Sequence, residues 1–332
     1  MTCHDDDDFL SELVPGIHAE SLCDASDDDD DEVSSASEKK SDERMVAAFP
    51  VFCSGAVTTP RGVVTPPGHR RKHHQQQQQR RRYHGELPPY ASWVDGKSVV
   101  SHEAWLGTTQ EVCDDLKFVN FDVVVFETLG VSIEQDGSMG KGGHVWDGAF
   151  VLAENLPEIA GTVLELGAGG TGLAGIALAR KCRPAKLVLT EGDDRLLPLL
   201  RRNVRRNNIE AEVEHLVWPM ADDDLFWHPA RSSGGPVDLG TTFDVIIAAE
   251  CIAPIYDPSA FVAALRRHSH ANTRVYLLGK DGRWPDHAAR VYAMLGLYFD
   301  FVYFDQHPPS RIKAPYYRLA VLVPKPTTSP VA

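Results

Sequence analysis

The sequence predicts an α/β fold in which a doubly wound, mostly parallel sheet ends in an antiparallel hairpin and follows a long disordered tail. Three observations lead to this prediction. From residue 116 onward, short apolar runs typical of strands alternate with segments of helical periodicity. A glycine-rich loop at 167–172 joins one such strand to a helix. The last two strand patterns, at 298–306 and 316–324, are separated by a loop with no helical pattern, so they must pair antiparallel.

The first hundred residues lack the periodic apolar pattern of a folded domain. They contain aspartate runs at 5–8 and 27–32 and a basic, glutamine-rich run at 69–84. Such segments bury too little apolar surface to offset the entropy lost on ordering. We therefore predict a largely disordered low-complexity tail over 1–100 and a folded domain over 116–324. A fragment that begins near Ser101 is expected to fold by itself.

Charge, cysteine spacing and hydropathy limit the classes of protein. The net charge of −14 owes much to the aspartate runs, so it says little about the substrate of the folded part. The 6 cysteines have no C-x-x-C spacing, which argues against a disulfide framework or a zinc site and favours a reducing compartment. No apolar run approaches the roughly 18 residues of a membrane span. We expect a cytoplasmic protein with no metal and no membrane partner; the basic run leaves a nuclear location open.

Each predicted element has a local signal. The segment 116–137 alternates like a β-hairpin, and 145–156 has helical spacing that ends before Pro157. The segment 193–208 begins with acids and ends with arginines, as the helix dipole favours. Further strands are predicted at 162–166, 186–190, 211–218, 243–250 and 273–280, and further helices at 171–181, 257–269 and 284–296.

The glycine loop is compatible with two cofactors. Glu191, at the end of the next strand, is placed to accept hydrogen bonds from the ribose of either a nicotinamide dinucleotide or S-adenosylmethionine. Only S-adenosylmethionine explains Glu165, two residues before the first glycine, because a carboxylate favours a cationic cofactor and repels a pyrophosphate. A sheet that closes with a hairpin also favours the seven-stranded methyltransferase fold. We predict S-adenosylmethionine as the cofactor; a purely structural glycine turn is the alternative.

Several motifs in register then point to a family. The segments 144–156, 163–179, 189–193, 201–208, 216–218 and 246–265 are similar, in order and spacing, to the protein lysine methyltransferases of the methyltransferase-like group. The resemblance covers 116–323. It implies a Rossmann-like class I methyltransferase fold, S-adenosylmethionine as cofactor and a protein substrate that is methylated on lysine.

The resemblance also assigns residues to the cofactor site. Trp146 would line the pocket, Gly167, Ala168 and Gly169 would pass under the methionine end of the cofactor, Glu191 would bind the ribose, Trp218 would flank the adenine, and Ala249 would offer backbone contacts beside the methyl group. Ordinary core packing is the alternative for both tryptophans.

One motif departs from the family pattern. Where the family has D-x-x-Y, this sequence has Glu250 followed by Cys251, Ile252 and Ala253, so the acid is one methylene longer and the aromatic is missing. Glu250 is predicted to orient the incoming ammonium. Tyr256, three residues further on, is predicted to replace the aromatic beside Glu250 at the mouth of the methyl-transfer site.

The altered motif leaves two other functions open. The segment 253–256 faintly resembles the [DN]-P-P-[YFW] motif of amide and nucleic-acid N-methyltransferases, but Ala253 lacks the side-chain acceptor that this chemistry needs. Nucleic acid is therefore the less favoured substrate. A catalytically degenerate methyltransferase fold that acts as an interaction protein is the other alternative.

Overall fold

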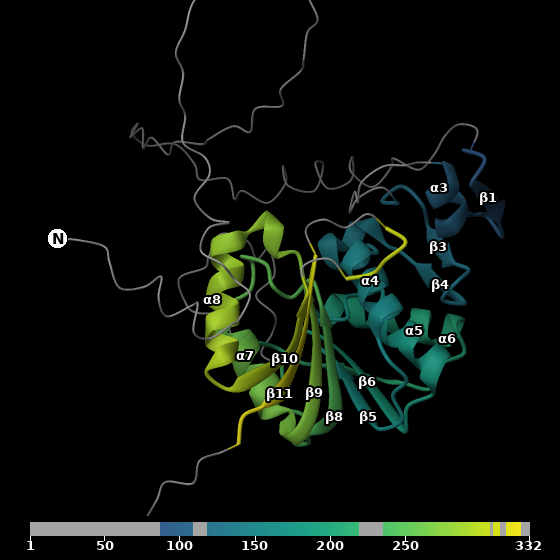
Figure 1. The fold of residues 1–332 in the computed structure, drawn as a ribbon. Helices are drawn as coiled ribbons and strands as arrows, with labels where there is room; N and C mark the ends of the chain where they lie inside the picture. Colours follow the sequence, from purple (N-terminus) through teal and green to yellow (C-terminus); the bar gives the residue numbers. More distant parts are fainter. Residues whose placement is uncertain (1–86, 109–117, 219–234, 306–307, 313–316, 327–332) are drawn as a thin grey trace, which may run out of the picture.

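The computed structural model describes two sheets and the helices that cover them (Figure 1). The described residues are 87–108, 118–218, 235–305, 308–312 and 317–326. Residues 1–86, most of the predicted tail, lie outside them, so the disorder predicted there stays a prediction.

The larger sheet has seven strands in the order β10-β11-β9-β8-β5-β6-β7. Its strands are β5 (Thr162–Glu165), β6 (Lys186–Glu191), β7 (Glu212–His215), β8 (Phe243–Ala249), β9 (Ser269–Gly279), β10 (Phe299–Asp305) and β11 (Arg318–Pro324). Strands β5 to β9 run parallel, whereas β11 is antiparallel to both β9 and β10. The predicted seven-stranded sheet with its closing hairpin is confirmed. The strand order reverses at β5, which pairs with β6 on one side and β8 on the other, and ligands of such sheets bind at this point.

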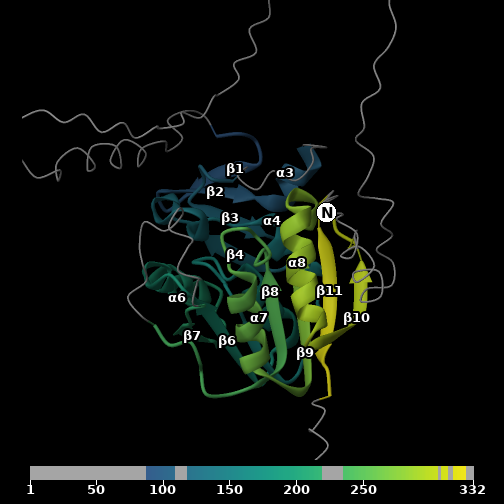
Figure 2. The same ribbon diagram turned by 90° about the vertical axis from the view of Figure 1, so that its left-hand side faces the viewer.

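Helices cover both faces of this sheet. The views in Figures 1 and 2 place α7 and α8 on one face and α4, α5 and α6 on the other. The helices are α4 (Asp147–Asn155), α5 (Leu173–Cys182), α6 (Leu197–Arg206), α7 (Pro258–Arg267) and α8 (Pro285–Gly296), with short 3-10 turns at η2 (Gly137–Met139), η3 (Lys141–Gly143), η4 (Asp194–Leu196) and η5 (Asp281–Arg283).

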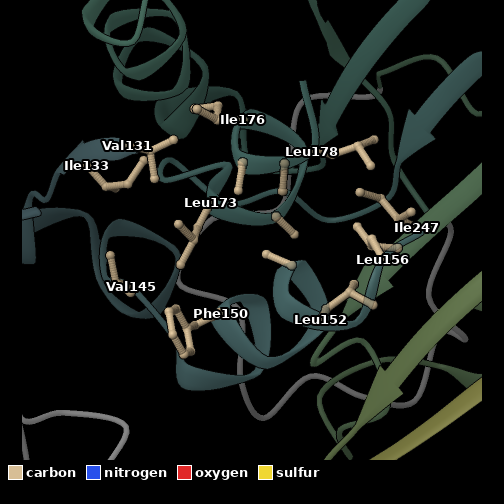
Figure 3. Packing of buried hydrophobic residues seen from close by; sticks show 14 of the residues in the cluster. Val131, Ile133, Val145, Phe150, Leu152, Leu156, Leu173, Ile176, Leu178 and Ile247 are labelled. Atoms are coloured by element: carbon tan, nitrogen blue, oxygen red, sulfur yellow. The ribbon is translucent and has the colours of Figure 1, made fainter. Parts of the chain in front are cut away.

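Each face of the sheet has its own hydrophobic core. Consecutive side chains of a strand point to opposite faces, and β8 shows this directly. Ile247 packs with the α4 and α5 side, where Phe150 and Leu173 are also buried (Figure 3), whereas Ile246 joins the core beneath α7 and α8. A parallel strand that is buried on both faces reads as a continuous apolar run, and that run made β8 predictable.

A smaller four-stranded sheet lies beside α4, α5 and α6, the helices on the second of these faces (Figure 1). It contains β1 (Ala91–Val94), β2 (Lys97–Ser101), β3 (Val123–Phe126) and β4 (Val131–Glu134). Helix α3 (His102–Thr108) directly follows β2. Strands β3 and β4 form the antiparallel hairpin that the sequence predicts within 116–137.

Strands β1 and β2 fall inside the range assigned to the tail. Strand β2 pairs in parallel with β3, Val100 is fully buried, and the Ser98 hydroxyl donates to Asp122 at 2.8 Å. The folded part therefore begins before residue 100, at least as early as residue 87. Strand β2 has only 5 residues and buries every second one, so its alternating pattern is too short to stand out beside the low-complexity sequence before it.

Candidate active site

The loop from β5 to α5 has the backbone that its glycines predict. Gly167, Gly169 and Gly172 all have φ between +56° and +66°, the left-handed region that favours glycine. A Cβ on Gly169 would lie 3.0 Å from the Gly142 carbonyl oxygen, and the Gly170 N–H donates to that same oxygen at 2.8 Å. The glycine loop therefore packs directly against the segment that precedes α4.

A buried asparagine ties the same loop to the small sheet. The Asn203 side chain, from α6, accepts a hydrogen bond from Glu134 N–H at 2.7 Å and donates to the carbonyl oxygens of Glu134 and Gly170, both at 2.9 Å. One turn later, Asn207 makes the equivalent pair of bonds with Ser132. The two amides satisfy the edge of β4 as a further strand would, and Asn203 also holds the loop.

Glu191 lies at the carboxyl end of β6, beside the glycine loop. Its Oε2 accepts a hydrogen bond from Gly169 N–H at 2.9 Å, and its Oε1 accepts one from Asp193 N–H at 2.9 Å. Burial raises the pKa of Glu191 above its ordinary value. The carboxylate is thus held at the place where the sequence predicts a ribose.

Glu165 lies deeper than its predicted role suggests. The side chain is only 3% exposed, and its Oε2 accepts a hydrogen bond from Gly175 N–H, in the first turn of α5, at 3.0 Å. Burial raises the pKa of Glu165 to about 8, against the lowering effect of the Gly175 hydrogen bond. Burial thus disfavours the charged form of this carboxyl, and the predicted attraction of a cationic cofactor stays a prediction.

Trp218 forms a wall beside the glycine loop. A Cβ on Gly167 would lie 3.1 Å from the Trp218 ring, which also packs against Phe261 with ring centroids 5.3 Å apart. The Trp218 indole nitrogen is buried and has no hydrogen-bond partner among the residues that the structure describes. An aromatic wall with an unused donor fits the predicted neighbour of an adenine.

Trp146 is hydrogen-bonded to η3, the turn that packs against the glycine loop. It is half-buried at the N-terminal end of α4, and its indole N–H donates to the Lys141 carbonyl oxygen at 2.9 Å. Ala249 ends β8 and is half-buried, next to Glu250.

Glu250 joins three segments that are far apart in the sequence. Its backbone N–H donates to the Leu278 carbonyl oxygen at 2.8 Å, and its φ of +60° is left-handed, which is unusual for a residue with a side chain. The Oε1 atom accepts hydrogen bonds from Gly148 N–H at 3.2 Å and from the Tyr317 hydroxyl at 2.5 Å. The acid is thus fixed at the carboxyl edge of β8.

The aromatic hydroxyl that meets Glu250 is Tyr317, which the sequence analysis missed. Tyr256, the predicted replacement, packs its ring edge-on against Trp218, with centroids 5.3 Å apart, and burial raises its pKa. The topology holds the signal that was missed. Strand β11 is antiparallel to β9, so its first residue lies at the edge where the parallel strands end.

Among the residues that the structure describes, no group of three or more histidine, cysteine, aspartate or glutamate side chains could hold a metal ion. No helix among those residues has the length and apolar character needed to cross a membrane.

Strand order, glycine loop and acids at successive strand ends define the class. A seven-stranded sheet of this order, with β11 antiparallel, is the fold of the class I S-adenosylmethionine-dependent methyltransferases. Residues 125–288 match the family described as lysine methyltransferase.

Several known proteins are similar to this chain. The chain is 32% identical over 149 residues to the protein-lysine N-methyltransferase EEF2KMT of Homo sapiens. The aligned region covers 40% of this chain and 44% of that protein. It is 28% identical over 142 residues to the protein-lysine N-methyltransferase EFM6 of Saccharomyces cerevisiae, covering 36% and 54%. The chain spans about half the length of the curated relatives it matches. Among solved structures, a methyltransferase from Pyrococcus furiosus aligns with 17% identity and a TM-score of 0.39, over 53% of this chain and 80% of that one.

Proposed function

We propose that this protein is an S-adenosylmethionine-dependent protein-lysine N-methyltransferase. The observation that carries the proposal is the fixed carboxylate of Glu250 at the carboxyl edge of β8. It lies beside β5, whose glycine loop, together with Glu191 at the end of β6, suits an adenosine. The match of residues 125–288 to lysine methyltransferases supports lysine as the acceptor.

The residues present fit the cofactor. The left-handed glycines allow the backbone to approach a ligand closely, Glu191 presents a carboxylate suited to ribose hydroxyls, and the unused Trp218 donor lies where a base would pack. Trp146, Ala168 and Ala249 complete the proposed lining. S-adenosylmethionine, when bound, supplies an electrophilic methyl group.

Glu250 would act on the acceptor amine. A lysine side chain has a pKa of about 10.4, so only on the order of one part in a thousand is neutral at physiological pH. The Glu250 carboxylate would bind the incoming ammonium, orient its nitrogen and accept the proton that it must lose. The neutral amine so formed would be the nucleophile for the methyl group that the bound cofactor would supply.

For the substrate we first propose the AAA ATPase valosin-containing protein, since the sequence resembles the lysine methyltransferase that acts on it. We further propose a cytoplasmic location from the cysteine pattern, with the nucleus as the alternative.

Calorimetry with S-adenosylhomocysteine and with NAD tests the cofactor. We expect micromolar or tighter binding of the former alone, and Glu191→Ala should weaken it by about 1 to 3 kcal/mol because hydrogen bonds to a charged group are lost. Binding of NAD without S-adenosylhomocysteine would refute the proposal. The absence of binding to either ligand would support an interaction protein instead.

Methyl transfer tests the acceptor. The full-length protein is incubated with radiolabelled S-adenosylmethionine and purified valosin-containing protein or a heat-treated cell extract, and the labelled product is hydrolysed to identify the modified residue. We expect methyl-lysine, and we expect Glu250→Gln to abolish it while cofactor affinity stays unchanged. Label in glutamine or in nucleic acid would identify the alternative N-methyltransferase class.

A further inference from the structure

Tyr317 occupies a place in the site that no motif predicts. It directly precedes β11 and lies outside the residues 125–288 that match the lysine methyltransferase family. Arg318 pairs with Gly279 across β11 and β9, so Tyr317 lies at the carboxyl edge of the parallel strands. Its side chain is only 1% exposed. The closing hairpin thus delivers a buried phenol to the proposed methyl-transfer site.

The contacts of Tyr317 are specific. Its hydroxyl donates to Glu250 Oε1 at 2.5 Å, the short distance of a hydrogen bond to a charged acceptor. The ammonium of Lys280, itself only 4% exposed, lies 5.2 Å from the centre of the Tyr317 ring, within the range of a cation–π contact. The ring is therefore held in place at both its hydroxyl and its face.

The second donor to Glu250 depends on a glycine. Gly148 N–H donates to the same Oε1 atom at 3.2 Å, and a Cβ at position 148 would lie 2.4 Å from that atom. Both donors therefore converge on one carboxylate oxygen. The left-handed backbone of Glu250 costs free energy, and backbones of this kind persist only where surrounding contacts determine them.

We propose that Tyr317 is a positioning residue that fixes the Glu250 carboxylate for the incoming lysine amine. It supplies the aromatic hydroxyl that the altered motif at 250–253 lacks, while Tyr256 supports Trp218. This inference rests on the proposed function and deepens it, because it names the group that holds the acid in place.

A cofactor analogue with its own amine tests the inference without any protein substrate. Sinefungin carries an amino group at the position of the transferable methyl, so its ammonium should meet Glu250, whereas S-adenosylhomocysteine has nothing there. We expect the wild-type protein to bind sinefungin more tightly than S-adenosylhomocysteine. In Tyr317→Phe that preference should fall about 10-fold, the loss expected when one hydrogen bond to a charged group is removed.

Two controls separate positioning from general damage. The Tyr303 hydroxyl also donates to a carboxylate, Asp305, at 2.7 Å, but on the exposed strand β10, so Tyr303→Phe should leave the preference unchanged. Affinity for S-adenosylhomocysteine should stay at the wild-type value in both variants. Adding Tyr317→Phe to Glu250→Gln should not lower the preference for sinefungin any further, because the two residues act as a unit.

The outcomes distinguish the two proposals. Failure of the wild-type protein to bind either ligand would overturn the proposed function together with the inference. Normal S-adenosylhomocysteine binding with an undiminished sinefungin preference in Tyr317→Phe would overturn the inference alone. If Tyr317→Phe folds poorly, Gly148→Ala tests the same geometry, because its Cβ displaces Glu250 Oε1 and should remove the preference too.

Discussion

The cofactor side and the acceptor side of the proposed site are built in opposite ways. Glu165, the glycine loop and Glu191 come from one continuous strand–helix–strand unit, and backbone N–H groups hold both acids. Glu250 is held by donors that are 102 and 67 residues away in the sequence. A local unit keeps its geometry as the rest of the chain varies, whereas an acid held by distant residues changes with any of them. The acceptor side is thus the part free to diverge.

The pH dependence of stability tests whether burial keeps Glu165, on the cofactor side, uncharged in the folded protein. This is the largest effect expected. The pKa of Glu165 is about 8 in the folded protein and near 4.5 when unfolded. Between these values the folded protein keeps a proton that the unfolded chain has lost, so the free energy of unfolding falls as pH rises from about 4.5 to 8. The loss is at most about 5 kcal/mol, at about 1.4 kcal/mol per pH unit.

Glu165→Gln isolates this contribution. The amide can still accept the Gly175 hydrogen bond but does not titrate, so the variant should lack that part of the slope. Denaturant unfolding of both proteins at pH 5, 6, 7 and 8 measures the difference. Equal slopes would show that Glu165 is charged in the folded state.

The Asn203 side chain connects the glycine loop to the small sheet, and its removal should give the second largest effect. Asn203→Ala leaves the Glu134 backbone groups and the Gly170 carbonyl without their partner, and we expect a loss of about 2 to 4 kcal/mol in stability. Affinity for S-adenosylhomocysteine should fall as well. Asn207→Ala is the matched control, because it loosens Ser132 without reaching the loop. Equal loss of affinity in both variants would contradict a specific role of Asn203.

Two glycines with the same backbone sharpen the comparison next. Gly169 and Gly240 have φ of +63° and +67°, but a Cβ on Gly240 meets nothing within 4 Å, whereas a Cβ on Gly169 meets Gly142. Both alanine variants should lose about 1 to 2 kcal/mol of stability through the left-handed backbone. Only Gly169→Ala should also weaken S-adenosylhomocysteine binding, by about 10-fold. Unchanged affinity in Gly169→Ala would show that the close packing of the loop does not shape the site.

Substitution of Tyr256 should have the smallest effect on affinity. It tests directly whether Tyr256 belongs to the cofactor side or to the acceptor side. Because its ring packs edge-on against Trp218, Tyr256→Ala should weaken S-adenosylhomocysteine binding by about 0.5 to 1.5 kcal/mol, the usual contribution of an aromatic pair. Calorimetry measures this change. A variant with full affinity but little methyl transfer would instead return Tyr256 to the acceptor side, where the sequence predicted it.

The accuracy of the sequence analysis follows the same division. The parallel strands and the closing hairpin were predictable because their apolar periodicity is local. In the structure Glu191 contacts Gly169 and Trp218 lies beside Gly167, and their roles toward a cofactor stay predictions. Tyr317 was missed because its position depends on the pairing of β11 with β9, which no local pattern records. The clamp of Asn203 depends likewise on how α6 meets β4, and β1 and β2 are too short for a clear period.

The length of the acid at position 250 has an evolutionary consequence. Glu250 reaches both Gly148 and Tyr317, and an aspartate, one methylene shorter, would fall short of them unless the backbone moved. Side-chain length, the glycine and the tyrosine should therefore have been selected together. In an alignment of related sequences, we expect glutamate at this position to co-vary with tyrosine at the start of the last strand. We expect aspartate to occur with the aromatic three residues later and with other residues in place of Tyr317.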